Sequence, residues 1–321
     1  MSDGDVTVLV ATRNRPNELK RCLESIFASS YRRFRVIVVD QSDNDETRIA
    51  CAAACDRRLD YVKDNGAGLS RARNLGIAAI SGGIVAMTDD DCVVARDWLE
   101  RLVQSFEENP DCMLAFGNFV AAPHDWRKDF IPSVTFEREA VLNGRGYRFL
   151  SRGCGGNMAA RRELFARVGG FDERLGAGAR FHASEDRDMH YRTCAAGLTT
   201  MEMPGAEVEH WGARSLLTGE AQRLQRNSAF GTGARLAKAF RCGDHKAAAV
   251  LARKVGDRLV TAARNLRAGK RPAGATQIPY VLLGFARGLA APIDSQVCVF
   301  QPGPDNTAER YDRVFRECLK R

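Results

Sequence analysis

Ile84-Val85-Ala86-Met87-Thr88-Asp89-Asp90-Asp91 is the stretch of the sequence that decides the fold. Its apolar run is typical of a buried parallel strand, and the three aspartates follow where such a strand ends. Like charges this close repel one another, so a fold that fixes them normally supplies a cation. Carboxylate ligands suit Mg²⁺ or Mn²⁺, and such a metal commonly holds a substrate diphosphate. A solvated acidic turn before a helix is the alternative that these residues leave open.

Short apolar runs alternate with helical patterns through the first hundred residues. Strands that alternate with helices build a parallel sheet through right-handed crossovers, and ligands bind beyond the carboxyl ends of its strands. Asp40 and the aspartate triplet both lie at such ends. From 111 to 153 the periodicity weakens, and we expect strands mixed with acceptor-side loops there. We expect strands at 6–11, 36–39, 59–62 and 84–88 and helices at about 17–28, 46–54, 69–79, 98–108, 161–168 and 185–196.

Composition and termini indicate the compartment. The 321 residues have an ordinary globular composition, and the ten cysteines form no paired framework, so we expect reduced thiols. Residues 1–5 are polar and acidic, unlike a secretory signal. The apolar stretch 278–293 is interrupted by two prolines and an arginine and is too short to cross a bilayer. These features predict a cytoplasmic protein that does not span a membrane.

The basic charge is concentrated near the C-terminus. Between 222 and 272 there are thirteen lysines and arginines against two acids, so this segment carries a charge of +11. Because the whole chain carries +8, the remainder carries −3. We place a domain boundary near residue 215, with a catalytic domain at 1–215 and a mainly helical, basic region at 216–321. That region is expected to contact the acceptor, a membrane or another subunit.

A helix in this basic region is predicted to be amphipathic, with its apolar stripe facing away from its cations. A solvated basic helix is the simplest interpretation, and peripheral attachment to an anionic membrane surface is the main alternative. Nucleic acid is disfavoured because the aromatic residues are too sparse for a stacking surface. The stripe consists of Val250, Leu251, Val255, Leu259, Ala262 and Leu266, and the opposing cations are Arg253, Lys254, Arg258 and Arg267.

Five motifs occur in a set order: VLVATRNR at 8–15, VVDQSD at 38–43, GLSRARNLG at 68–76, the aspartate triplet, and Glu185-Asp186. In order and spacing they resemble the family-2 glycosyltransferases of the GT-A fold, over roughly residues 5 to 212. The resemblance implies an α/β fold with a Rossmann-like, mostly parallel sheet flanked by helices. It also implies an enzyme that moves a sugar from a nucleotide diphosphate to an acceptor hydroxyl, inverting the anomeric centre. A UDP-sugar is the favoured donor, in polysaccharide, glycolipid or cell-surface glycan synthesis.

The resemblance also implies roles for single residues. The nucleotide-sugar would be bound by Thr12, Arg13, Asp40, Arg71, Asp89, Asp90 and Asn157. Asp91 would be the direct ligand of Mn²⁺ or Mg²⁺, with Asp89 and His210 as further ligands, although a histidine beside a tryptophan is equally typical of packing. Many relatives carry a second acid after Asp40, whereas this chain has Gln41.

The inverting reaction needs a base that takes the acceptor's proton as the hydroxyl attacks. The resemblance assigns this role to Asp186, with Glu185 orienting the acceptor or Asp186. The alternative for both acids is a structural one, because carboxylates are favoured in the first turn of any helix. The glycines at 153, 155 and 156 before Asn157 indicate either backbone close to a ligand or a plain turn.

Two other functions fit parts of this pattern. A metal-dependent sugar nucleotidyltransferase uses a related sheet, but it usually needs a glycine-rich phosphate loop after the first strand, and residues 12–16 contain no glycine. A protein that binds nucleotide-sugar or nucleic acid without catalysis is the second alternative.

Overall fold

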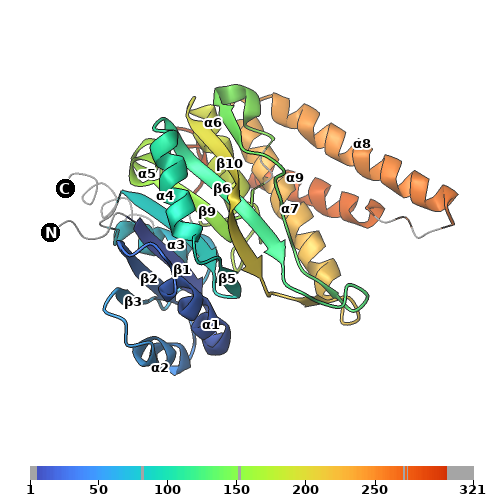
Figure 1. Ribbon diagram of the computed structural model, residues 1–321. Helices are drawn as coiled ribbons and strands as arrows, with labels where there is room; N and C mark the ends of the chain where they lie inside the picture. Colours follow the sequence, from blue (N-terminus) through green and yellow to red (C-terminus); the bar gives the residue numbers. More distant parts are fainter. Residues whose placement is uncertain (1–5, 81–82, 151–152, 270–271, 273, 302–321) are drawn as a thin grey trace.

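The computed structural model describes residues 6–80, 83–150, 153–269, 272 and 274–301. It is an α/β structure with one large twisted sheet between layers of helices, and a group of C-terminal helices to one side (Figure 1). The terminal segments 1–5 and 302–321, on which the leader prediction and the end of the basic region fall, lie outside the described residues.

The elements of the first half follow the predicted alternation. They are β1 (Val6–Thr12), α1 (Pro16–Phe27), β2 (Phe34–Asp40), α2 (Glu46–Ala53), β3 (Leu59–Lys63), α3 (Leu69–Ala78), β4 (Ile84–Asp89), β5 (Cys92–Val94), α4 (Trp98–Glu108) and β6 (Cys112–Ala121). The second half adds β7 (Asp129–Phe130), β8 (Ala140–Asn143), a 3₁₀ turn (Gly144–Tyr147), β9 (Asn157–Arg161), α5 (Arg162–Val168), α6 (Glu185–Ala195), β10 (Thr199–His210), β11 (Arg214–Ser215), α7 (Glu220–Arg241), α8 (Lys246–Arg267), a second 3₁₀ turn, η2 (Ala275–Gln277), α9 (Ile278–Ala290), β12 (Ile293–Asp294) and β13 (Val299–Phe300).

The large sheet has the predicted mostly parallel core. Among the described residues its order is β3-β2-β1-β4-β9-β6-β10-β5, with β8 also paired to β10. The pairs β3–β2, β2–β1, β1–β4 and β6–β10 are parallel, whereas β9 runs antiparallel between β4 and β6. The register sets Thr12 opposite Asp40 and Ala11 opposite Asp89. The predicted meeting of polar side chains at the carboxyl ends of three strands is therefore confirmed.

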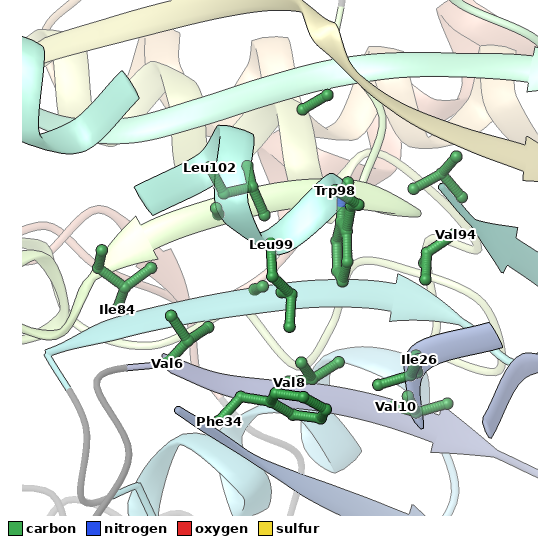
Figure 2. Close-up of a cluster of buried hydrophobic side chains, with 14 of the residues drawn as sticks. Val6, Val8, Val10, Ile26, Phe34, Ile84, Val94, Trp98, Leu99 and Leu102 are labelled. Atoms are coloured by element: carbon green, nitrogen blue, oxygen red, sulfur yellow. The ribbon is translucent and has the colours of Figure 1, made fainter. Parts of the chain in front are cut away.

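Helices bury both faces of the sheet because its central strands are apolar on both sides. On one face, α1 and α4 cover β1 and β4, and Figure 2 shows Trp98, Leu99 and Leu102 of α4 above Val6 and Val8. On the other face, α3, α5 and α6 pack on the same strands. The predicted helices of the first 200 residues are all present to within two residues at each end.

The long strand β10 was not predicted from the sequence, and neither were β5 and β9. The register of β10 shifts between Met203 and Glu207, and its pattern mixes acids and a proline with apolar residues. The weakly periodic segment 111–153 forms β6, β7, β8 and a 3₁₀ turn, as the expected mixture of strands and loops. In the described part of the chain, no helix is both long and apolar enough to cross a membrane.

Glycines bring α7 and α9 into close contact. A β-carbon on Gly233 would lie 2.0 Å from the carbonyl oxygen of Val281, and one on Gly284 would lie 2.0 Å from that of Phe230. A buried ion pair joins α7 to the sheet domain: Lys238 contacts Asp172 and, at 2.7 Å, Asp188, and all three side chains are fully buried. The boundary predicted near residue 215 falls just before α7, and it stays a prediction.

One prediction that bears on the C-terminal region is wrong. Cys242 and Cys298 form a disulfide, so the expectation of reduced thiols fails for this pair, because the β12–β13 hairpin folds back onto the end of α7. The seven other described cysteines are free.

The structure shows which face of α8 is covered, a point that the stripe pattern left open. Leu259 and Leu266 are 55% and 61% exposed, whereas Lys254 and Arg258 are half-buried against the rest of the protein. Only Ala247 and Ala262 of α8 are fully buried among the residues described for this helix. A stripe pattern gives the two faces of a helix but does not say which one the fold covers.

We predict that breaking the disulfide destabilises the C-terminal helices. The bond closes a sequence separation of 56 residues, so its loss removes up to about 4 kcal/mol of stability by the loop-entropy estimate. Chemical denaturation of a Cys242→Ser/Cys298→Ser double variant measures this. Cys55→Ser, which changes an exposed free thiol, is the control and should match the parent protein. An unchanged midpoint in the double variant would mean that the bond contributes nothing.

Candidate active site

A cavity of about 660 Å³ opens at the carboxyl ends of β1 and β4. Five of the predicted site acids and bases line it together: Asp89, Asp90, Asp91, Glu185 and Asp186. Thr12, Arg13 and His210 line it as well, and the C-terminal helices close one side through Leu224, Gln225, Ser228, Ala229, Arg258 and Gln277. The sequence thus predicted one wall of the cavity, and the other wall is formed by α7, α8 and the turn before α9.

The aspartate triplet is fixed by the loop after β1. Thr12 donates a hydrogen bond of 2.8 Å to Asp90, and Arg15 lies 3.1 Å from Asp90 and 3.0 Å from Asp91. Burial raises the pKa of Asp90 to about 6, although Arg15 opposes this. Burial would raise the pKa of Asp91 too, but His210 and the nearby arginines outweigh it and lower that pKa to about 2. Asp91 is therefore the most strongly ionised acid of the three.

His210 reaches Asp91 through strand pairing. In the register of β10 with β5, His210 lies opposite Cys92, directly after the triplet. Its Nδ1 is 3.0 Å from the carbonyl oxygen of Pro132, which leaves Nε2 3.5 Å from Asp91 Oδ1. Gly212 makes this approach possible, because a β-carbon there would lie 2.4 Å from both Asp91 Oδ2 and His210 Nε2.

Asp91 and His210 fit the chemistry of a divalent metal. A carboxylate and an imidazole suit Mn²⁺, and Mg²⁺ or Mn²⁺ in such sites commonly takes one or two protein ligands with substrate phosphates and water. Across the described residues, no three His, Cys, Asp or Glu side chains already surround one point. Asp89 faces the same cavity but is held by Arg73 at 3.0 Å, so Asp91 and His210 are the better donors.

A buried arginine connects the two acidic groups of the site. Arg73, only 2% exposed, donates to Asp89, to Glu185 at 3.2 Å and to the carbonyl oxygen of Gly155 at 3.1 Å. Burial and then the charge of Asp186 raise the pKa of Glu185 to about 7, with Arg73 opposing. Glu185 thus both lines the cavity and pairs with Arg73.

Asp186 is presented by a strained loop. His182 and Ser184, just before it, have φ values of 61° and 78°, a left-handed conformation that non-glycine residues rarely adopt. The carboxylate accepts hydrogen bonds from the backbone N–H groups of Gly155 (3.1 Å) and Arg187 (2.6 Å). Helix α7 supports the loop, since a β-carbon on Gly231 would lie 2.5 Å from the carbonyl oxygen of Ala183. Strain of this kind persists only where surrounding contacts enforce it.

Some predicted nucleotide contacts lie away from the main cavity. Asp40 is fully buried and accepts hydrogen bonds from Tyr61 (2.7 Å) and Lys63 (3.3 Å). Arg71 forms an ion pair of 2.9 Å with Asp64. Gln41 donates to the same carboxylate at 2.8 Å. Gln41, Asp64 and Arg13 line a second cavity of about 500 Å³ beside the first, and Asp40 and Arg71 line neither cavity.

Asn157 braces strands in this structure. Its amide is fully buried, donates to the carbonyl oxygens of Asn118 and Ala206, and accepts from the Trp98 indole. The glycines before it have a packing reason: β-carbons on Gly155 and Gly156 would lie 2.7 Å from Arg73 and 2.8 Å from Asp89. These glycines accommodate the buried ion pair.

Four residues of the site were not predicted to belong to it: Arg15, Arg73, Gly212 and Gly231. For Arg73 the sequence indicated at most a role in bracing its loop. Arg15 and Arg73 belong to recognised motifs, but several arginines stand in each, and nothing local distinguishes the one that meets an acid. The two glycines carry no signal until the strands and α7 are placed against the site.

The sheet, the acidic triplet at its edge and the cavity beyond it define the GT-A class of nucleotide-sugar transferases. The sequence profile of glycosyl transferase family 2 matches residues 7–169, just over half of the chain. This chain belongs to glycosyl transferase family 2.

Curated relatives match parts of this chain. A glucosyl-dolichyl phosphate glucuronosyltransferase of Haloferax volcanii is 30% identical over 182 residues, covering 53% of this chain and 57% of that protein. A pre-mycofactocin glycosyltransferase of Mycobacterium tuberculosis is 30% identical over 222 residues, covering 65% and 43%. Glycosyltransferase GlyA of Streptococcus pneumoniae is 33% identical over 119 residues, covering 36% and 17%. This chain therefore spans between 17% and 57% of the lengths of these relatives.

Solved structures confirm the fold. The mannosyltransferase PcManGT from Pyrobaculum calidifontis, in complex with GDP-Man and Mn²⁺, has a TM-score of 0.60 at 20% identity and covers 89% of this chain and 87% of its own. S. aureus TarS in complex with UDP-GlcNAc has a TM-score of 0.51 at 16% identity and covers 71% and 66%. The predicted GT-A architecture is therefore confirmed.

We predict that Gly231→Ala disturbs the loop that carries Asp186. The added methyl group must displace the carbonyl oxygens of Phe181 and Ala183, which costs about 1–3 kcal/mol of stability. Hydrogen exchange of the backbone amides around Ser184 should accelerate, and denaturation should shift to lower denaturant. Gly256→Ala in α8 is the matched control, because a β-carbon there meets nothing within 4 Å and should stabilise the helix by about 0.5–1 kcal/mol. Unchanged exchange in Gly231→Ala would contradict the supporting role of α7.

Proposed function

We propose that this protein is an inverting, metal-dependent glycosyltransferase that moves a sugar from a nucleotide-diphosphate sugar to an acceptor hydroxyl. The observation that carries the proposal is one cavity that holds an Asp91–His210 donor pair and, on a separate element, the carboxylate of Asp186. Relatives named as glycosyltransferases and family membership support it. Synthesis of a polysaccharide, glycolipid or cell-surface glycan is the proposed context.

The donor nucleotide extends from the main cavity into the second one. Arg13 and Gln41 line both cavities, so a base and ribose held there would leave the diphosphate beside the aspartate triplet. Solved neighbours of this fold bind UDP-GlcNAc and GDP-Man. We favour a UDP-sugar. The amide of Gln41, already bound to Asp64 and Gly68, stands where many relatives carry an acid.

Mn²⁺ or Mg²⁺ would be held by Asp91 and His210, with Asp89 nearby. When bound, the metal supplies a positive charge that stabilises the diphosphate as a leaving group. PcManGT, which has this fold, was solved with Mn²⁺. Arg15 and Arg214, at 3.0 and 3.8 Å from Asp91, keep that carboxylate ionised and turned toward the cavity.

Asp186 is the proposed base. As the acceptor oxygen forms its bond to the anomeric carbon, the bond from that carbon to the diphosphate breaks on the opposite face, and the hydroxyl proton passes to the Asp186 carboxylate. The two backbone N–H groups that bind this carboxylate fix its direction. Glu185 and Arg73 hold the start of α6 in place behind it.

A sugar nucleotidyltransferase is less well supported. The loop after β1 offers Thr12 and Arg15 to the acids of the triplet, and it contains no glycine-rich cradle for a triphosphate. The match to glycosyl transferase family 2 also disfavours this alternative and a purely binding role.

We predict that two isosteric variants lose different functions, sugar transfer in one and donor binding in the other. Asp186→Asn should lower sugar transfer by about 10²–10⁴-fold, because the proton has no acceptor, while donor binding in the presence of Mn²⁺ is retained. Asp91→Asn should instead abolish the stabilisation that a nucleotide-sugar with Mn²⁺ gives in a thermal-shift screen. The screen uses UDP- and GDP-sugars with and without metal. Full transfer by Asp186→Asn would exclude this residue as the base.

We further propose peripheral attachment to an anionic membrane through α8 and α9. Figure 1 shows these helices projecting to one side of the sheet. Their outward faces carry exposed Leu259, Val260, Leu266, Leu282 and Leu283. Exposed arginines stand among these leucines, and the segment 222–272 carries a net charge of +11. Apolar residues in a strongly basic helix are typical of binding to anionic lipid surfaces.

Vesicle flotation tests this attachment. The protein should float with vesicles that contain phosphatidylglycerol and not with neutral vesicles, and binding should weaken as salt rises. Leu259→Ser/Leu266→Ser should weaken binding about tenfold, since two apolar side chains leave the interface. Ile49→Ser is the control, because Ile49 is equally exposed but lies on α2. No flotation with anionic vesicles at low salt would exclude the membrane.

A further inference from the structure

The cavity wall next to the proposed base is basic. Arg187 directly follows Asp186 and lines the cavity from α6, and Arg258 lines it from α8. Arg258 is held in place by hydrogen bonds to Gln277 at 3.3 Å and to the carbonyl oxygen of Lys254 at 3.1 Å. This wall is separate from the Asp91–His210 pair, because α6, α7 and α8 form it.

Two further cations stand close to these arginines. Arg235 of α7 is 4% exposed, and Lys254 of α8 is half-buried. Repulsion from Arg187, Arg235 and Arg258, added to burial, lowers the pKa of Lys254 to about 8. Burial likewise lowers the pKa of Arg235 to about 10. Lys254 therefore lies within the electrostatic field of the other three cations, and Arg235 lies within that of Arg187.

Among the described residues, acids attract this cluster only from beyond ion-pair distance: Asp186 and Asp188 act on Arg235, and Asp257 acts on Lys254 and Arg258. Within the described part of the chain, Arg187, Arg235, Lys254 and Arg258 form no ion pair, and the buried Nε of Arg235 has no hydrogen-bond partner. Lys238, one turn further along α7, shows the contrast, since it contacts both Asp172 and Asp188. The acids nearby are engaged: Arg192 and Lys238 hold Asp188, and Arg253 lies 3.8 Å from Asp257.

Burying unpaired cations costs free energy. Helix α8 nevertheless turns Lys254 and Arg258 toward the protein and leaves Leu259 and Leu266 exposed. A fold keeps such an arrangement when a ligand supplies the missing negative charge. Three arginine forks and a lysine suit the several oxygens and the double charge of a phosphate group better than a single carboxylate.

We propose that Arg187, Arg235, Lys254 and Arg258 form an acceptor subsite for a phosphate group. The acceptor would thus be a phosphorylated molecule, with its phosphate bound by this cluster and its hydroxyl at Asp186, one residue before Arg187. The inference rests on the proposed glycosyl transfer and adds the chemical class of the acceptor. The phosphate forms no covalent bond there, because the cluster only orients the acceptor.

Binding of inorganic phosphate tests the subsite directly. Titration calorimetry is run with the donor site saturated by UDP, or by GDP if UDP does not bind, and Mg²⁺, so that phosphate cannot report on the diphosphate site. The intact protein should bind phosphate, and Lys254→Gln and Arg258→Gln should each weaken binding at least about tenfold. Arg253→Gln is the matched control: it removes the same charge from the neighbouring residue, whose side chain is 79% exposed, and should leave phosphate affinity unchanged.

A second arm separates the sources of the phosphate. Octyl phosphate that binds much more tightly than inorganic phosphate indicates a lipid-linked acceptor, and equal affinities indicate a soluble phosphorylated sugar or polymer. Absence of phosphate binding while UDP or GDP binds with Mg²⁺ would overturn this inference and leave the proposed function intact. Equal affinities in Lys254→Gln, Arg258→Gln and Arg253→Gln would overturn it as well. Failure to bind any nucleotide or nucleotide-sugar would instead count against the proposed function.

Discussion

The buried charge of Arg73 is the constraint on which the site depends. A guanidinium stays protonated at any physiological pH, so a fold that buries it must keep its partners in place. Here the partners are the end of β4, the start of α6 and the backbone at Gly155. Because Gly155 also donates to Asp186, the same ion pairs fix the distance between the triplet and the proposed base. Removing both acids, Asp89 and Glu185, would leave the buried charge of Arg73 unpaired, which is far more costly than losing a surface ion pair.

Helix α7 provides the second fixed reference. It touches the strained loop before Asp186 through Gly231, and it joins α6 through the buried pair of Lys238 with Asp188. It also lines the cavity and packs tightly on α9 through glycines. The C-terminal helices are therefore part of the site, although they carry none of the recognised motifs.

Much of the fold and of one cavity wall could be predicted because the signals are local. Buried parallel strands can be recognised in the sequence as apolar runs, and the topology of the sheet alone brings the acids at their ends together. What sequence could not supply depends on tertiary placement. Asp40 lies at the predicted edge of the sheet, but its carboxylate accepts hydrogen bonds from Tyr61 and Lys63. Arg73 is buried and pairs with Asp89, whereas Arg71, two residues earlier, pairs with Asp64. Likewise, Cys242 and Cys298 meet only because a hairpin returns to α7.

The division of the cavity between two halves of the chain has a consequence for how this family diversifies. The stretch that the family profile matches ends at residue 169, whereas Asp186 and the basic wall all lie beyond it. Under the proposed function, changes in the later helices would exchange one acceptor for another while the half that the profile matches stays unchanged. Proteins that share this half would then act on unrelated acceptors, and a comparison of the helices after residue 215 would separate them.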